Sequence, residues 1–185
     1  QAEMFLEGDT ATTLGLLADA VRAAGVDEAA VADRHALWAA AHKERIAAQR
    51  AKEAEDAAKD TISPVALCAA LSAAAPDDAI FMDETITHRG TVLTHLGNGG
   101  PNSYFRAHGG LGQALGMAMG MKLALPDRTI ISTMGDGTFM YNPVVQCLAL
   151  AQHENLPTLT VVFNDDGYSA MKFNQRDYYP DGVGA

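Results

Sequence analysis

The sequence predicts an α/β domain with a mostly parallel sheet flanked by helices, and three observations lead to this fold class. Residues 129–134 and 158–163 are apolar and β-branched runs of the kind found in buried strands. A helical segment at about 142–153 separates them, which gives a strand–helix–strand unit. Each strand-like run ends in an acidic turn. In a parallel sheet both turns lie at the carboxyl ends of the strands, where such sheets bind ligands.

Composition limits the classes of protein that this chain can belong to. It has 185 residues, of which 48% are apolar, enough for one domain with a sizeable core. Its net charge is −10 and it has no basic stripe, so nonspecific nucleic-acid binding is not expected. The most apolar stretch, 111–125, is shorter than the ~20 residues that span a bilayer, so no membrane partner is expected.

The expected cellular location is the cytoplasm. The first residues, QAEMFLEGD, are acidic and contain no long apolar core, so they do not form a signal peptide. Cys68 and Cys147 lie in apolar, helix-like runs without the spacing of a metal site. Both are predicted to be buried free thiols, as in a reducing compartment.

Two helical segments are predicted before the compact domain. Asp9 is a candidate cap for a helix that runs to about Ala24, with Gly25 as its stop and with an apolar face made of Leu14, Leu17 and Val21. Residues 27–60 are rich in alanine and charge and contain neither Pro nor Gly. They predict a long exposed helix or helical linker, and the alternative is a helix that docks on a partner domain.

The compact domain is expected to begin at Thr61. Ser63 followed by Pro64 is a typical helix start, with the cap before the first helical position. Residues 79–82 form a short candidate strand, which delivers the turn 83–88 to its carboxyl end. This turn arises in the same context as the acidic turn at 135–137, although threonine and aspartate also favour ordinary capped turns.

A glycine-rich segment covers residues 108–120. Gly112, Gly116 and Gly120 recur every four residues, and on a helix they form one smooth face that another backbone can approach. Residues 110–116 superficially match a dinucleotide-binding glycine loop. No convincing strand precedes them and position 115 is leucine, so this match is weak.

The residue types of the two acidic turns favour a magnesium–phosphate site. Asp136, Asp165 and a carbonyl near Gly167 offer the hard oxygen ligands that Mg²⁺ takes alongside phosphate and water. Two glycines flank Asp136 and let the backbone approach a phosphate, and Thr138 can donate to it. The alternative for Gly-Asp-Gly alone is a tight turn.

The two turns together resemble the diphosphate-binding motif of thiamine diphosphate (ThDP) enzymes. In this chain Gly135-Asp136-Gly137 is followed by Asn164-Asp165 just under thirty residues later. The acetolactate synthase and benzoylformate decarboxylase branch is the most similar. The resemblance implies ThDP and Mg²⁺ as cofactors, with Asp136 and Asp165 as side-chain ligands and Gly167 as a carbonyl ligand. The family usually has Asn at position 165, so the added charge is expected either to tighten the metal or to repel the diphosphate.

The resemblance also implies roles for residues outside the metal site. Leu111 falls where a bulky side chain bends the cofactor, and the Gly109 carbonyl where it accepts from the aminopyrimidine. His88 and His108 are the candidate acid–base groups, although a histidine in such a position is often structural or exposed. Met171 stands where some decarboxylating relatives carry a carboxylate, which argues against a pyruvate-decarboxylase-like proton relay. The residues assigned to the diphosphate and its surroundings are Thr85, Thr87, Gly135, Gly137, Thr138, Asn164 and Tyr168.

The resemblance implies a domain organisation and a partner. Residues 1–26 resemble the end of a central domain, 27–60 form the helical linker, and 61–185 form a diphosphate-binding domain that is incomplete at its C-terminus. The pyrimidine-binding domain, which supplies an activating glutamate, has no counterpart in this sequence. The sequence is therefore expected to be either a fragment, which the central-domain remnant favours, or one of two subunits. Because the cofactor sites of this family lie between subunits, the resemblance implies the pyrimidine-binding domain of a second subunit as partner, in a homodimer or homotetramer.

The expected function is that of a ThDP- and Mg²⁺-dependent 2-oxo acid decarboxylase or carboligase, a lyase or transferase that cleaves or forms a C–C bond next to a carbonyl. This chain alone is expected to be inactive. One alternative keeps the cofactor and uses acyl-CoA substrates, as oxalyl-CoA decarboxylase and 2-hydroxyacyl-CoA lyase relatives do. The other is a noncatalytic interaction module that keeps the fold without the cofactor.

Overall fold

The structure is a computed structural model that describes residues 5–97 and 99–183. The chain divides into two units, one up to Ala51 and one from Lys52 onward, and each is described by itself. The first four residues of the predicted central-domain remnant lie outside the described residues. Among the described residues, no helix is both long and apolar enough to cross a membrane.

The first unit contains helix α1 (Thr10–Ala24) and most of helix α2 (Glu28–Ala57). Asp9 caps α1 by accepting the Thr12 N–H at 2.9 Å, and Gly25 ends it with φ 78°. Both predicted ends of this helix are therefore confirmed. No residue of α1 is buried, so the predicted apolar face lies open within this unit.

The second unit begins with the last turn of α2 and helix α3 (Pro64–Ala74). Ser63 caps α3 as predicted, because its Oγ accepts the Ala66 N–H at 3.1 Å. The same hydroxyl donates to Asp56 at 2.8 Å. The hydrogen bonds from Lys59 and Lys52 hold the pKa of the Asp56 carboxyl well below its usual range. This cluster joins the end of α2 to the start of α3.

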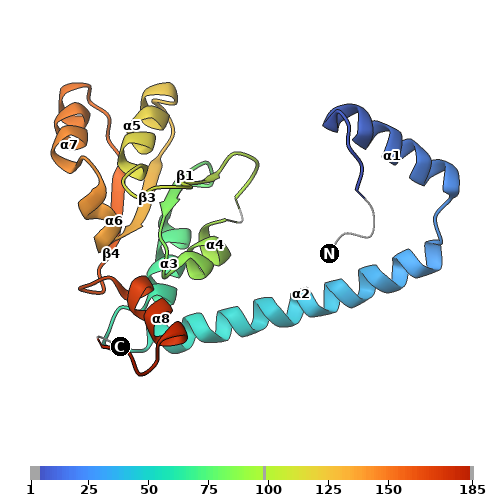
Figure 1. Ribbon diagram of the computed structural model, residues 1–185, viewed down its shortest axis with the longest axis horizontal. Coiled ribbons are helices and arrows are strands. Elements are labelled where there is room, and N and C mark those ends of the chain that lie inside the picture. The colour runs from blue at the N-terminus through green and yellow to red at the C-terminus, as the bar shows by residue number, and fades with distance from the viewer. Residues whose placement is uncertain (1–4, 98, 184–185) are drawn as a thin grey trace. The chain divides into compact units, whose positions relative to one another are not determined.

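Four parallel strands form the sheet, in the order β2-β1-β3-β4 (Figure 1). The chain runs from β1 outward through α4 to β2, and returns through α5 to β3 on the other side of β1. It then passes through α6 and α7 to β4, and α8 follows. The elements are β1 (Ile80–Glu84), α4 (Arg89–Leu96), β2 (Tyr104–Arg106), α5 (Ala114–Ala124), β3 (Ile130–Gly135), α6 (Asp136–Tyr141), α7 (Val144–His153), β4 (Leu159–Phe163) and α8 (Ser169–Tyr178). The reversal between β1 and β3 is a topological switch point, the place where open α/β sheets bind ligands.

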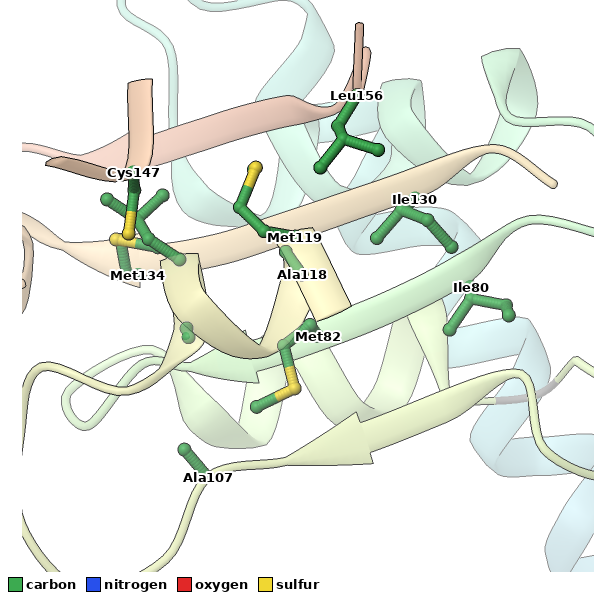
Figure 2. Packing of buried hydrophobic residues seen from close by; sticks show 11 residues of the cluster. Ile80, Met82, Ala107, Ala118, Met119, Ile130, Met134, Cys147 and Leu156 are labelled. Atoms are coloured by element: carbon green, nitrogen blue, oxygen red, sulfur yellow. The ribbon is translucent and has the colours of Figure 1, made fainter. Parts of the chain in front are cut away.

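Each face of the sheet has its own hydrophobic core, as expected for a parallel sheet covered on both sides. Ile80, Met82, Ile130 and Met134 point to the face that packs against α5 and α7, as Figure 2 shows for this cluster. The residues between them in the strands, Phe81 and Ile131, face α3 and α4 together with Cys68, Val92 and Leu96. The alternation places Asp83 on the α3–α4 side and Glu84 on the α5–α7 side.

The structure differs from the prediction at several elements. The strand predicted at 79–82 continues to Glu84, so Asp83 and Glu84 are buried strand residues and not part of the turn. Strand β2 and helix α6 were not predicted, because three and six residues are too short to display a period. Helix α8 was not predicted either.

The three regularly spaced glycines do not form one helix face. Gly112 precedes α5 and has φ +97°, and a Cβ at this position would lie 2.4 Å from the Tyr141 carbonyl oxygen. Gly116 and Gly120 do lie on α5, but a Cβ added to either would meet no atom within 4 Å among the described residues apart from the neighbouring backbone of α5 itself. The predicted close backbone packing is therefore correct for Gly112 alone, and there the loop before α5 is pressed against the end of α6.

Replacement of Gly112 by alanine is expected to lower the free energy of unfolding by about 2 kcal/mol or more, because the positive φ and the contact with Tyr141 both oppose a side chain. Gly116→Ala is the matched control, since its site is open and helical. It is expected to raise the free energy of unfolding by up to about 1 kcal/mol. Urea unfolding followed by circular dichroism measures both, and equal values for the two variants would contradict the assigned packing.

Candidate functional site

A cavity of about 200 Å³ lies where β1, β3 and β4 end, at the switch point of the sheet. Three of the segments that line it follow these strands directly, and the fourth comes from the loop before α5. The lining residues are Thr85, Ile86, Thr87, His88, Leu111, Gly135, Asp136, Gly137, Thr138, Tyr141, Phe163, Asp165, Gly167, Tyr168, Ser169, Ala170 and Met171. The cavity thus unites segments that are up to 86 residues apart in the sequence, from 85 to 171.

The two acidic turns meet at Asp136, the first residue of α6. Its Oδ1 accepts the Gly137 N–H at 2.8 Å, and its Oδ2 accepts the Gly167 N–H at 3.1 Å. The second bond fastens the loop after β4 to the loop after β3. Within the β4 loop, the Asp166 N–H donates to Asn164 Oδ1 at 3.1 Å, and Asp166 has φ 57°. These bonds hold Asp165 and Gly167 at the same cavity as Asp136.

The donor set of this corner fits a hard divalent cation. Asp136 and Asp165 line one cavity, and the bonds to Gly137 and Gly167 leave lone pairs on the Asp136 carboxylate. Among the described residues, no group of three His, Cys, Asp or Glu side chains could hold a metal. Such a two-carboxylate set suits Mg²⁺, which completes its shell with phosphate oxygens and water.

The hydroxyl side chains of the cavity differ in what they can donate. Thr85 is fully buried, and both its N–H and its Oγ1 donate to Asp83 Oδ1, at 2.9 and 2.7 Å. Its proton is therefore already used within the protein. Thr87 is exposed and Thr138 is buried, and both line the cavity. Of the three threonines, Thr87 and Thr138 are therefore the ones that can donate to a ligand.

An apolar and aromatic wall faces the acidic corner. The His88 ring lies against the Phe163 ring, with 5.4 Å between the centroids. A Cβ on Gly137 would lie 3.2 Å from Tyr168 Cε1, so this glycine lets the tyrosine ring approach the Gly-Asp-Gly turn. Leu111 contributes a partly exposed side chain to the same cavity. The site therefore combines carboxylates with aromatic and apolar side chains, which suits a ligand that has both a charged part and a planar apolar part.

Three of the predicted site residues do not line the cavity. These are His108, Gly109 and Asn164. His108 is exposed, and its carbonyl accepts the Gln113 side chain at 3.3 Å. Gly109 has φ +101°. Of the two candidate acid–base groups, His88 is the one that lines the cavity.

Six lining residues were not predicted as site residues, namely Ile86, Tyr141, Phe163, Ser169, Ala170 and Met171. Each lies next to a predicted segment or between two of its residues. Ile86 lies between the two threonines of its turn, and Phe163 ends β4. Position relative to a strand end is a signal that could have found these two residues. Tyr141 ends α6, and residues 169–171 form the first turn of α8. Neither helix was predicted, so these residues could not be assigned to the site.

Buried polar groups behind the cavity keep the turn after β1 in place. Asp83 Oδ1 accepts the Thr133 hydroxyl at 3.0 Å, and Asp83 Oδ2 accepts the Tyr104 hydroxyl at 2.7 Å. Burial, and then this hydrogen bond, raise the pKa of Tyr104 well above its usual range. Burial raises the pKa of the Cys68 thiol to about 12, helped by the Asp83 charge. Cys68 is therefore a neutral thiol at physiological pH, and it is free, as predicted.

The fold and the site together define a class of protein. A parallel sheet with a switch-point cavity, lined by two aspartates and by apolar and aromatic side chains, is typical of domains that bind a phosphorylated coenzyme through a divalent cation.

Comparison with known proteins identifies the family within this class. Residues 87–183 match the family described as "Thiamine pyrophosphate enzyme, C-terminal TPP binding domain". The chain is 33% identical over 104 residues to benzoylformate decarboxylase of Pseudomonas aeruginosa, which is 56% of this chain and 19% of that protein. It is 29% identical over 127 residues to the acetolactate synthase isozyme 1 large subunit of Escherichia coli, which is 67% of this chain and 22% of that protein.

A solved structure supports the same assignment. The thiamine diphosphate-dependent 4-hydroxybenzoylformate decarboxylase of Rhodococcus jostii RHA1 superposes with a TM-score of 0.60 and 30% identity, over 66% of this chain and 23% of that chain. The chain belongs to the thiamine pyrophosphate enzymes and contains their C-terminal cofactor-binding domain. It spans about a fifth of the length of the curated relatives that it matches.

Proposed function

We propose that this chain is the diphosphate-binding part of a ThDP- and Mg²⁺-dependent enzyme that cleaves or forms a C–C bond next to the carbonyl of a 2-oxo acid. The observation that carries this proposal is the convergence of Asp136, Asp165 and Gly167 with Leu111 in one switch-point cavity. The names of the relatives, decarboxylases and acetolactate synthase, support the reaction class.

The acidic corner is the proposed anchor for the metal and the diphosphate. Asp136 and Asp165 would bind Mg²⁺ by their side chains and Gly167 by its carbonyl. Thr87 and Thr138 would donate to the diphosphate, and Gly135 and Gly137 would let it approach the backbone. Because the chain is acidic overall, the metal and the backbone N–H groups would provide the positive field that the diphosphate needs.

The apolar wall is the proposed support for the rings of the cofactor. Leu111 would hold the rings in a bent arrangement, and the Gly109 carbonyl would accept from the amino group of the pyrimidine. When bound, ThDP supplies a nucleophilic carbon that adds to the substrate carbonyl and accepts the electrons released when a carboxylate leaves. The protein contributes position, exclusion of water and a proton donor or acceptor.

His88 is the proposed acid–base residue. It lines the cavity with its ring against Phe163, and imidazole is the most common general acid or base in enzymes. His108 is exposed and lies outside the lining, so it could act only if substrate or a partner chain approached it. Met171 also lines the cavity and offers no proton, and His88 is the histidine of the lining.

The proposed enzyme needs a second part. The pyrimidine-binding domain and its activating glutamate are proposed to come from another subunit of a homodimer or homotetramer. The particular activity depends on which 2-oxo acid is the substrate and on whether the remaining unit is released or transferred. Loss of CO₂ from a 2-oxo acid followed by protonation releases an aldehyde, whereas a carboligase transfers the remaining unit to a second carbonyl. Turnover of pyruvate and of aromatic 2-oxo acids by the full-length protein would separate these two activities.

Calorimetric titration of the full-length protein with ThDP, with and without Mg²⁺, tests the proposal. Binding is expected with Mg²⁺, and affinity is expected to fall by at least about tenfold when a chelator removes the metal, because the diphosphate then faces two uncompensated carboxylates. The control is thiamine, which lacks the diphosphate and should bind weakly with or without metal. Absence of ThDP binding under both conditions would favour a noncatalytic interaction module.

A further inference from the structure

Glu84, the last residue of β1, is a buried carboxylate whose hydrogen-bond partners are all N–H groups. It is 3% exposed, and no cation forms an ion pair with it in the described parts of the chain. The Gln113 N–H donates to Oε1 at 2.9 Å and to Oε2 at 3.2 Å, and the Ala114 N–H donates to Oε2 at 2.9 Å. A buried charge of this kind is tolerated only while its donors stay in place.

Asn142, at the junction of α6 and α7, completes the arrangement. Its Nδ2 donates to Glu84 Oε2 at 3.2 Å and to the Thr138 carbonyl at 2.9 Å. Its Oδ1 accepts the Leu115 N–H at 3.1 Å. These two buried side chains, named here the Glu84–Asn142 clamp, bind the N–H groups of three successive residues where α5 begins. Such groups have no partner within their own helix.

The clamp joins three of the segments that line the cavity. Glu84 directly precedes the threonine turn, Gln113 lies two residues after Leu111, and Asn142 is bonded to Thr138. The loop that carries Leu111 is also pressed against the end of α6, because Gly112 leaves no room for a Cβ beside the Tyr141 carbonyl. Glu84 is therefore bonded to the residues that directly follow the Leu111 loop.

The neighbouring carboxylate, Asp83, has a different set of partners. It lies on the other face of the sheet and binds Thr85, Thr133 and Tyr104. None of the hydrogen bonds described for Asp83 reaches α5 or Asn142. Asp83 thus supports the threonine turn, whereas Glu84 supports the wall that carries Leu111.

We propose that Glu84 is a positioning residue that, through the Glu84–Asn142 clamp, sets Leu111 against the rings of the cofactor and contributes little to diphosphate binding. The inference rests on the proposed function. Its physical basis is the charge of Glu84 more than its size. In a Glu84→Gln variant an NH₂ group replaces one carboxylate oxygen, and it must face at least one of the N–H groups that donate to the carboxylate in the wild type. Two donors cannot form a hydrogen bond with each other, so the start of α5 shifts.

The test compares two probes, ThDP and inorganic diphosphate, each titrated with Mg²⁺ into the full-length protein. Glu84→Gln is expected to weaken ThDP binding by about tenfold, the usual effect of one lost buried partner, and to change diphosphate binding by less than about twofold. Thr138→Ala is the comparison variant, because Thr138 is proposed to donate to the diphosphate. It is expected to weaken the binding of both probes by a similar factor. Equal weakening of both probes by Glu84→Gln, or no weakening of either, would overturn the proposal.

A second measurement separates positioning from general stability. Lys122, at the other end of α5, is also a buried charge that binds backbone groups, since its Nζ donates to the Pro126 and Arg128 carbonyls at 2.7 Å each. Lys122→Met is expected to lower stability and to leave the ratio of the two affinities unchanged. If Glu84→Gln does not fold, Asn142→Ala breaks the same clamp and is expected to cause the same selective loss. A ratio that Lys122→Met also changes would overturn the proposal.

Hydrogen exchange distinguishes a failure of this inference from a failure of the proposed function. Glu84→Gln is expected to accelerate exchange of the Gln113, Ala114 and Leu115 amides by at least about tenfold, whether or not a cofactor binds. Unchanged exchange in Glu84→Gln would overturn the role of the clamp and would leave the proposed function standing. Wild-type protein that binds neither probe would overturn the proposed function, and the positioning role with it.

Discussion

Replacement of Asp136 by alanine is expected to reduce the Mg²⁺-dependent affinity for ThDP by at least about a hundredfold. Loss of a residue that only supports a metal ligand typically costs 10- to 100-fold, and Asp136 is proposed to bind the metal itself. The variant also loses the bond to the Gly167 N–H, which fastens the two acidic turns to each other. Calorimetric titration of ThDP with Mg²⁺ measures the effect, and circular dichroism should show unchanged helical content.

The matched control for this variant is Asp166→Asn. It removes one negative charge from the loop after β4, at a residue that does not line the cavity, and asparagine tolerates the φ of 57° found there. This control is expected to bind ThDP with nearly wild-type affinity. Unchanged affinity in Asp136→Ala would remove the metal assignment, whereas equal losses in both variants would indicate a nonspecific effect of charge.

Replacement of Leu111 by alanine is expected to slow turnover by about 10- to 100-fold and to weaken ThDP binding by a smaller factor. The side chain lines the cavity and is proposed to support the bent cofactor, and a displacement of about 1 Å in a reacting group has an effect of this size. The exchange rate of the C2 proton of bound ThDP, measured by NMR, is the direct readout, because it depends on the bent arrangement.

Leu123→Ala is the control for the leucine variant. Leu123 lies on α5, is 66% exposed, and borders a separate apolar groove with Gly116 and Cys147. Its truncation removes the same atoms without touching the candidate site, so C2 exchange should remain at the wild-type rate. A wild-type exchange rate in Leu111→Ala would refute the proposed role of Leu111.

The parts of the fold that could be predicted are those with local signals. Strands β3 and β4 begin within one residue of their predicted starts, because apolar runs bounded by polar turns identify buried strands. The start of α3 follows from Ser63 and Pro64, and the ends of α1 from Asp9 and Gly25. The acidic turns followed from residue type and from the parallel arrangement.

The parts that could not be predicted depend on contacts between distant residues. The helix within the glycine-rich segment begins at Ala114, where Glu84, about thirty residues earlier, binds its first N–H groups. No local pattern at residues 108–113 indicates this start. The same contact explains why the prediction of one helix face with three glycines was wrong, since Gly112 lies before the helix and not on it. Asn142 could not be recognised either, because its partners come from four different elements.

The strand order also has a consequence for how the protein folds. The central pairing joins β1 to β3 across about fifty residues, as the bond between Asp83 and Thr133 illustrates, and such distant pairings make folding slow. The contact between Asp136 and Gly167 can form only after β4 has joined the sheet. Intermediates that lack β4 would therefore not bind the cofactor. A ligand at a hundred times its Kd would stabilise the native state by about 2.7 kcal/mol, and none of this stabilisation would reach those intermediates.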